Sequence, residues 1–114
     1  MPIYHIAFPA DWDAAKSAGS YTFSSKGRTL AEEGFIHASQ ASQVAWVANR
    51  FYSEDDGLIL LVIDPDRLVS KVRYEPAPGV DLPFPHIYGP INPDAVTGVL
   101  PLERGPDGKF QFAA

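Results

Sequence analysis

The chain has 114 residues, of which 46% are hydrophobic and 20% charged, and this size and composition suit one globular domain over residues 1–114. Its 14 acidic and 9 basic side chains leave a net charge of −5, so the basic surface that binds nucleic acid non-specifically is not expected. Cysteine is absent, which excludes disulfides, thiolate catalysis and cysteine-ligated zinc.

The first half of the chain reads as alternating short strands and helices. Residues 3–8 are β-prone and predict a strand, whereas 9–19 predict a helix because Pro9 stands at its start and Gly19 at its end. Residues 19–30 are polar and predict a loop. "LAEEG" predicts about one helical turn closed by Gly34, "FIHAS" (35–39) a short strand, and 40–52 a second helix with Ser39 as its N-cap.

The second half predicts strands only. "GLILLVID" (57–64) is apolar on both faces and predicts a central strand, and "DPDRL" predicts a turn. Further strands are expected at 71–76, 84–89 and 96–103, with a loop at "PAPGVDLP" and an edge strand in the tail. Two helices in the first half, followed by several strands, indicate an α+β fold with helices packed on bent or paired antiparallel sheets.

The sequence predicts a cytoplasmic protein without a membrane segment. No apolar run reaches the roughly 18 residues that a membrane-spanning helix needs. The N-terminus also lacks the basic start and apolar core of a signal peptide.

Each of the three histidines, His5, His37 and His86, lies inside a predicted strand. Because side chains alternate across a strand, His37 shares a face with Phe35 and Ser39, and His86 shares one with Phe84 and Tyr88. Aromatic walls with a few placed polar groups are typical of ligand clefts. We therefore expect the histidines to share a site, while each taken singly could equally be a half-buried structural side chain, and Ser39 a helix cap.

Several of these segments resemble a bacterial family catalogued as domain of unknown function 952. The segments are "YHIA", "EEGFIHAS", "VANRFY", "LLVIDPDRL", "VRYEP" and "FPHIYGPI", and they run from residue 3 to about 102. The family in turn looks like a compact relative of the ADP-ribosyl superfamily, which contains the RNA 2′-phosphotransferases and the ADP-ribosyltransferases. The resemblance implies an ADP-ribosyltransferase-like fold, with NAD or a related nucleotide as substrate.

The same resemblance implies roles for individual residues. His5, in a segment similar to "YHGT", would contact the ribose, while His37 and Ser39, in a segment similar to "HVHLS", would lie beside the nicotinamide. Tyr88 would stack on the ligand, and Arg28 and Arg50 would bind its pyrophosphate. Where many members of the superfamily have a catalytic Glu, this chain has His86, so the acid would have to come from Glu75 on a neighbouring strand.

Two other classes of function stay open at this level. Three neutral imidazoles on three strands could hold a catalytic zinc, although no HxH or HxxxH spacing brings two of them together locally. A non-catalytic module that binds a small ligand or a protein partner would instead depend on the acidic surface and on exposed aromatics, for which Trp12, Trp46 and Phe112 are the candidates.

Overall fold

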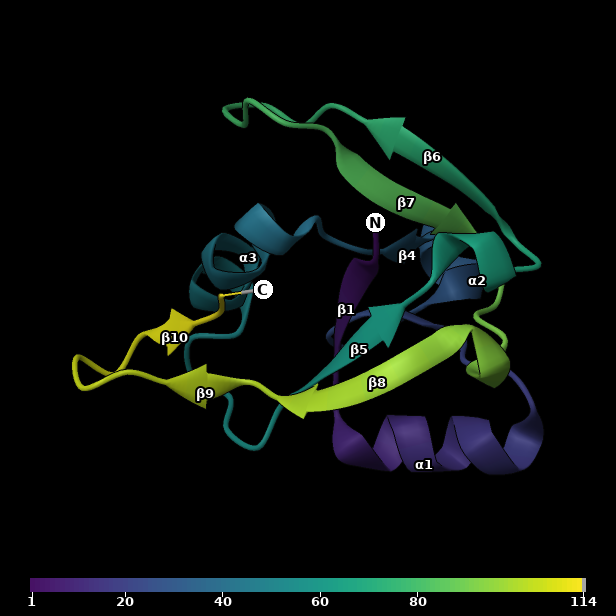
Figure 1. Cartoon of the computed structure of the whole chain (residues 1–114), viewed down its shortest axis with the longest axis horizontal. Helices are drawn as coiled ribbons and strands as arrows, with labels where there is room; N and C mark the ends of the chain where they lie inside the picture. Colours follow the sequence, from purple (N-terminus) through teal and green to yellow (C-terminus); the bar gives the residue numbers. More distant parts are fainter. Residues whose placement is uncertain (114) are drawn as a thin grey trace.

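Three antiparallel strands form the central sheet of the computed structural model, which describes residues 1–113. Their order is β1 (Ile3–Ala7), β5 (Ile59–Ile63) and β8 (Val96–Pro101), with Ile3 opposite Ile63 across the first pair (Figure 1). The prediction that "GLILLVID" supplies the central strand is confirmed. A strand that is apolar on both faces is stable only where both faces are covered, as they are here.

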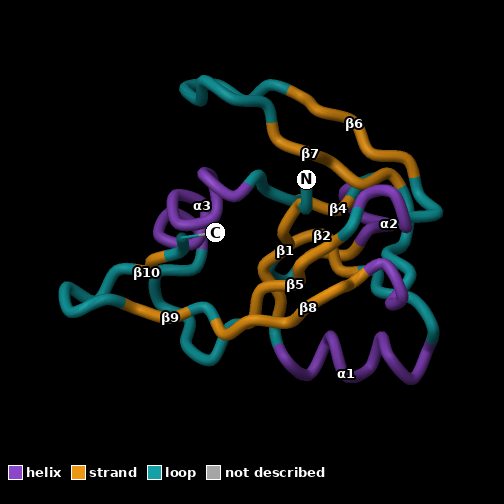
Figure 2. The backbone as a smooth tube through the Cα atoms, viewed as in Figure 1, coloured by secondary structure: helices purple, strands orange, loops and turns teal. Residues whose placement is uncertain are grey.

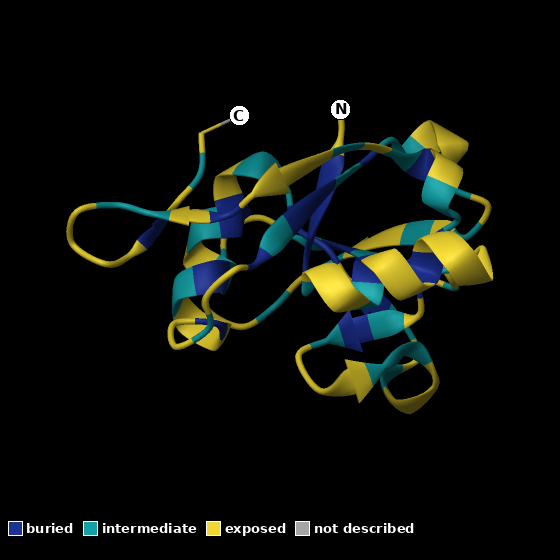
Figure 3. Cartoon of the chain, turned by 90° about the horizontal axis from the view of Figure 1, so that it is seen from below, coloured by how far each residue is buried: buried dark blue, intermediate teal, exposed yellow. Residues whose placement is uncertain are grey.

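Two hydrophobic cores cover the two faces of this sheet, and strand β1, which follows the N-terminus, is coloured as buried in Figure 3. Alternation along β1 sends Ile3 and Ala7 into one core and Tyr4 and Ile6 into the other. Helix α1 (Pro9–Ala18) contributes to the first core, and helix α3 (Val44–Phe51) packs in the second. Both cores therefore depend on the same strands.

A second antiparallel sheet has the order β4 (Ile36–His37), β7 (Phe84–Tyr88) and β6 (Lys71–Glu75). Its β6–β7 hairpin lies along one side of the molecule, above α3 in Figure 1. Backbone hydrogen bonds between Tyr4 and Ser39, at 2.9 and 2.7 Å, connect β1 to the chain just after β4. The expected α+β architecture with paired antiparallel sheets is thus present.

The α-helices of the described chain lie in its first half, as predicted, and only the start of the last one differs from the prediction. Helix α1 begins at Pro9 and ends at Gly19, whose φ of 84° is left-handed. Helix α2 (Leu30–Glu33) is the predicted turn; a capping box between Thr29 and Glu32 begins it, and Gly34 ends it. The predicted helix 40–52 starts as a 3₁₀ turn, Ala41–Gln43, followed by α3.

The prediction that Ser39 caps this helix is wrong. Gln40 occupies the cap position, and its backbone N–H donates to the side chain of Gln43. Ser39 is instead held in extended backbone by its two hydrogen bonds to Tyr4. The long-range strand pairing therefore moves the helix start one residue later than the local pattern predicts.

The predicted loop 19–30 also contains regular structure (Figure 2). Strands β2 (Phe23–Ser25) and β3 (Arg28–Thr29) form a small hairpin there. The expected strand 96–103 is interrupted after Pro101, and β9 (Glu103–Arg104) pairs with β10 (Phe110–Gln111) near the end of the chain. No helix in residues 1–113 combines the length and apolarity needed to cross a membrane.

Candidate functional site

A cleft of about 830 Å³ opens between the two sheets and α3. Strand β1 and the segment after β4 contribute residues to it, α3 lines one side, and the β2–β3 hairpin and β7 supply others. Six of the residues predicted to form a site line this cleft: His5, Arg28, His37, Ser39, Arg50 and His86. Its volume is within the range of pockets that bind small molecules.

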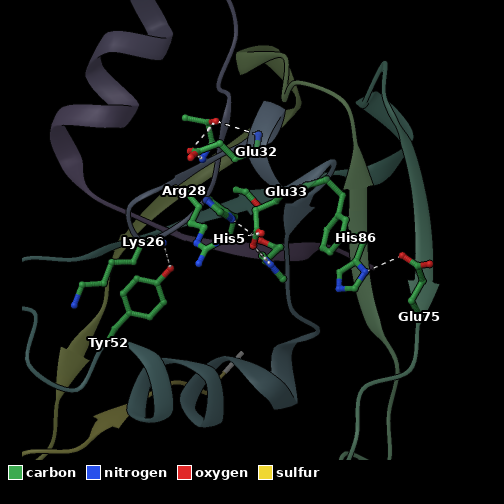
Figure 4. A network of polar contacts seen from close by, with 12 residues as sticks. His5, Lys26, Arg28, Glu32, Glu33, Tyr52, Glu75 and His86 are labelled. Atoms are coloured by element: carbon green, nitrogen blue, oxygen red, sulfur yellow. Dashed lines mark hydrogen bonds and ion pairs between the residues drawn. The ribbon is translucent and has the colours of Figure 1, made fainter.

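His86 occupies one side of the cleft and is held there by Glu75 (Figure 4). Its Nδ1 donates to Glu75 Oε1 at 2.8 Å, because a carboxylate oxygen can only accept. Nε2 is then the atom that can take up or release a proton, and it has no hydrogen-bond partner within residues 1–113. A carboxylate that orients a histidine in this way is a recurring element of catalytic sites.

Glu75 also accepts a hydrogen bond of 2.5 Å from the Tyr88 hydroxyl. This bond, together with the one from His86, lowers the pKa of Glu75, while Glu75 raises the pKa of Tyr88. Neither residue lines the cleft, so both act behind His86. The pairing of β6 with β7 brings these three side chains together.

His37 also has a carboxylate partner, Glu33. Its Nε2 lies 3.3 Å from Glu33 Oε1, and the other oxygen of Glu33 lies 3.5 Å from Arg28 Nη1. Partial burial lowers the pKa of His37, so its neutral form is favoured. The rings of His37 and His86 are in edge-to-face contact with their centroids 5.4 Å apart.

His5 is held differently from the other two histidines. Its ring is 3% exposed; Nδ1 donates to the His37 carbonyl at 2.5 Å, and Nε2 accepts from the Tyr21 hydroxyl at 3.0 Å. Burial lowers its pKa to about 4 and raises that of Tyr21. With both nitrogens occupied, His5 supports the cleft wall, and its predicted contact with a ribose would require one of these bonds to break.

Cationic side chains surround the other side of the cleft. Lys26 and Tyr52 lie across from His86 and Glu75 in Figure 4, and Lys26 Nζ forms a 2.7 Å ion pair with Asp55. The buried Tyr52 hydroxyl accepts the backbone N–H of Lys26 at 3.2 Å, and burial raises its pKa. Arg50 forms no ion pair with a carboxylate of residues 1–113; its guanidinium lies 5.6 Å from the rings of Trp46 and Phe51.

Aromatic rings complete the walls. Phe35 stacks on His86 with ring centroids 4.1 Å apart, and Trp46 lies 6.2 Å from Phe84. Of the three aromatics expected to be exposed, only Trp46 is, at 47%. Trp12 is buried in the first core, and Phe112 is half-buried and packs edge-on against Tyr4, so the expectation that these two are exposed is wrong.

A three-histidine metal site has no support in the geometry. Both nitrogens of His5 are already hydrogen-bonded. Across residues 1–113, no group of three His, Cys, Asp or Glu side chains is arranged to bind a metal ion.

The sequence did not predict several polar residues of the cleft, among them Lys26, Glu33 and Tyr52. Lys26 and Glu33 come from segments taken for a loop and a single helical turn. Glu33 precedes His37 by four residues, but this spacing predicts a contact only within a helix, and here the helical turn ends at Gly34 before the strand that contains His37. Tyr52 follows the last turn of α3, and only the packing of that helix turns its hydroxyl toward Lys26.

The paired sheets and the histidine-lined cleft define a small α+β protein, and a family model identifies the family to which it belongs. The model described as "Protein of unknown function (DUF952)" matches residues 6–99, and the chain belongs to this family. The family resemblance predicted from the sequence is thereby confirmed.

Solved structures of a similar protein share the fold. The crystal structure of protein CC0527 from Caulobacter crescentus is 32% identical, covers 97% of this chain and 94% of its own, and has a TM-score of 0.83. The solution NMR structure of CC0527 is 32% identical, with 96% and 91% coverage and a TM-score of 0.77. No curated protein matches the chain.

Proposed function

We propose that the cleft binds NAD or a related nucleotide and that the protein catalyses group transfer from it. The observation that carries the proposal is the combination of a carboxylate-held His86 with the cationic side chains Lys26, Arg28 and Arg50 in one cleft. Cations bind the phosphates of a nucleotide, and an oriented histidine can move a proton during transfer. The resemblance to the ADP-ribosyl superfamily supports the same substrate class.

Two transfers fit these groups. In ADP-ribosyl transfer, the bond from nicotinamide nitrogen to ribose C1′ breaks and its electron pair leaves with nicotinamide. The acceptor oxygen then bonds to C1′ while His86 Nε2 takes the acceptor's proton. In 2′-phosphoryl transfer, the acceptor oxygen bonds to phosphorus and gives its proton to His86 Nε2, the bond from phosphorus to O2′ breaks, and the departing O2′ takes that proton to become a hydroxyl, while the arginines stabilise the charge on the phosphate. Glu75 serves as a positioning residue in either case, because it bonds to the other ring nitrogen of His86.

A thermal-shift and calorimetric titration tests binding directly. The ligands are NAD, ADP-ribose, nicotinamide and a 2′-phosphorylated nucleotide, because they separate the phosphate-binding and ring-binding parts of the cleft. A ligand at a hundredfold excess over its Kd should stabilise the folded protein by about 2.7 kcal/mol. We expect His37→Ala to abolish this shift and to leave the melting temperature of the free protein nearly unchanged, because its side chain is 44% exposed.

Two arginine variants make the test specific. Arg50→Gln should raise the Kd of phosphate-bearing ligands roughly tenfold, since a charge-assisted hydrogen bond contributes about 1.5 kcal/mol or more. Arg67→Gln is the matched control, because Arg67 pairs with Asp64 and does not line the cleft. No shift with any of the four ligands would refute the proposed function.

A further inference from the structure

We propose that His37 and His86 form a general acid–base pair that cleaves short ribonucleotide phosphodiesters. The inference rests on the proposed nucleotide cleft and narrows its substrate class. Two histidines line the cleft, and each is bonded to a carboxylate. Glu75 holds Nδ1 of His86, and Glu33 holds Nε2 of His37.

The two carboxylates bind different ring nitrogens of their histidines, and this difference suggests that the histidines take part in one reaction. In His86 the free nitrogen is Nε2, and in His37 it is Nδ1; neither has a hydrogen-bond partner among the described residues. The two rings lie side by side on neighbouring strands, since His37 is the register partner of His86. Two proton-carrying groups in one cleft are needed where one oxygen must lose a proton while another gains one.

Cleavage of a ribonucleotide phosphodiester by its own 2′-hydroxyl requires both proton transfers. One histidine takes the proton of a ribose 2′-hydroxyl, and the O2′ atom forms a bond to phosphorus. The bond from phosphorus to O5′ of the next nucleotide breaks, and the other histidine donates a proton to the departing O5′. The products are a 2′,3′-cyclic phosphate and a free 5′-hydroxyl, so atoms and charges balance without a further reactant.

Neighbouring charges suit a phosphodiester. Arg28, Lys26 and Arg50 line the cleft, and Arg28 Nη1 lies 3.5 Å from Glu33, the carboxylate partner of His37. Such cations stabilise the negative charge that develops on the phosphoryl oxygens. The net charge of −5 disfavours long polyanions, and the cleft of about 830 Å³ suits a ligand of about dinucleotide size.

The test uses a 3′,5′-linked diribonucleotide and a matched analogue that lacks the attacking 2′-hydroxyl. Products are separated by chromatography, and the cyclic phosphate is identified by ³¹P NMR. We expect the wild-type protein to form the cyclic phosphate and to leave the analogue intact. His37→Gln and His86→Gln should each lower kcat at least a hundredfold, and the double variant should be little slower than the slower single variant.

Matched variants separate chemistry from folding and from contaminating ribonuclease. Glu75→Gln and Glu33→Gln should each lower kcat less than the histidine changes do, and Glu75→Gln should leave KM nearly unchanged, because Glu75 lies outside the cleft and only orients His86. Arg67→Gln, purified identically, should behave as wild type. Binding of the analogue, measured by calorimetry, should persist in His86→Gln.

The outcomes distinguish the two proposals. Binding of the analogue without cleavage of the diribonucleotide overturns the acid–base pair and leaves the nucleotide cleft standing. Cleavage that His86→Gln removes and His37→Gln does not also overturns the pair. Failure to bind the analogue, NAD and ADP-ribose overturns both.

Discussion

His5, His37 and His86 occupy three different electrostatic surroundings, although each stands in a strand. The difference comes from what contacts their ring nitrogens. His5 meets a carbonyl and a tyrosine hydroxyl and is sealed from water, whereas each of the other two meets one carboxylate and keeps one nitrogen free. A buried, fully bonded histidine stabilises the fold, and one with a free nitrogen in a cleft can exchange protons with a ligand.

The buried His5 predicts a loss of stability in mild acid. Its pKa is about 4 in the folded protein against 6.5 in the unfolded chain, so between these values the unfolded chain binds a proton that the folded chain does not. Stability is therefore complete above pH 6.5 and falls as the pH drops toward 4. Between pH 7 and pH 5 we expect a loss of about 2 kcal/mol in the free energy of unfolding from this group.

Urea denaturation at the two pH values measures this loss. The comparison protein is His5→Gln, which keeps a polar side chain and cannot titrate in this range. It should be less stable than wild type at pH 7 and should show a smaller change between pH 7 and pH 5. An equal pH dependence in both proteins would mean that His5 is not the responsible group.

Among the elements, the 3₁₀ turn Ala41–Gln43 decides where one wall of the cleft lies. The Gln43 side chain donates to the carbonyls of Leu82 and Pro83 at 3.0 and 3.2 Å, and Gln40 donates to the same Pro83 carbonyl at 2.8 Å. The end of the loop before β7 is thereby attached to the start of α3. Ala77, Pro78 and Val80 of this loop line the cleft.

We therefore expect Gln43→Ala to loosen the β6–β7 hairpin. Gln43 is buried, and its loss leaves the Leu82 carbonyl and the Gln40 N–H without their partner, while the Pro83 carbonyl keeps only its bond from Gln40, at a cost on the order of 2 kcal/mol. Urea unfolding measures that cost, and amide hydrogen exchange should show lower protection in Phe84–Tyr88. Ser42→Ala, an exposed change in the same turn, is the control; equal protection in both variants would contradict the assigned role.

Strands and helices were predicted correctly where a local sequence signal coincided with burial, and were missed where long-range pairing determined the structure of the segment. Strand Ile59–Ile63 was predictable from its apolar run, and helix Pro9–Ala18 from the proline at its start and the glycine after its end, because these are local features. The β2–β3 hairpin was not, because most of its residues are polar and its strands are only three and two residues long. It depends partly on contacts made elsewhere, such as the hydrogen bond from the Ser24 hydroxyl to the Phe35 carbonyl.

At the scale of the whole molecule, the two hydrophobic cores share the strands of one sheet. Ile3 and Tyr4 are consecutive in sequence and enter different cores, as do Leu60 and Leu61. Neither core can lose its strands while the other stays intact. The molecule should therefore unfold as one cooperative unit.

The two tryptophans allow this prediction to be checked. Trp12 belongs to the first core, and Trp46 lies on α3, which packs in the second. In Trp46→Phe the tryptophan fluorescence comes from Trp12 in the first core, and in Trp12→Phe it comes from Trp46 on α3. In each variant, urea curves from fluorescence and from far-ultraviolet circular dichroism should coincide. Separate transitions would show that the two cores unfold independently.

The sequence by itself determined the α+β class, the central strand, the helix ends at Gly19 and Gly34, and the family. These follow from periodicity, turn residues and motifs, which act over a few residues. Only the tertiary structure decided that His5 is buried, that Glu75 and Glu33 hold the other two histidines, and that Lys26 and Tyr52 face them. The His86–Glu75 pair depends on strand register, which no local pattern encodes, and the contacts of His5 with His37 and of Lys26 with Tyr52 join residues 32 and 26 positions apart.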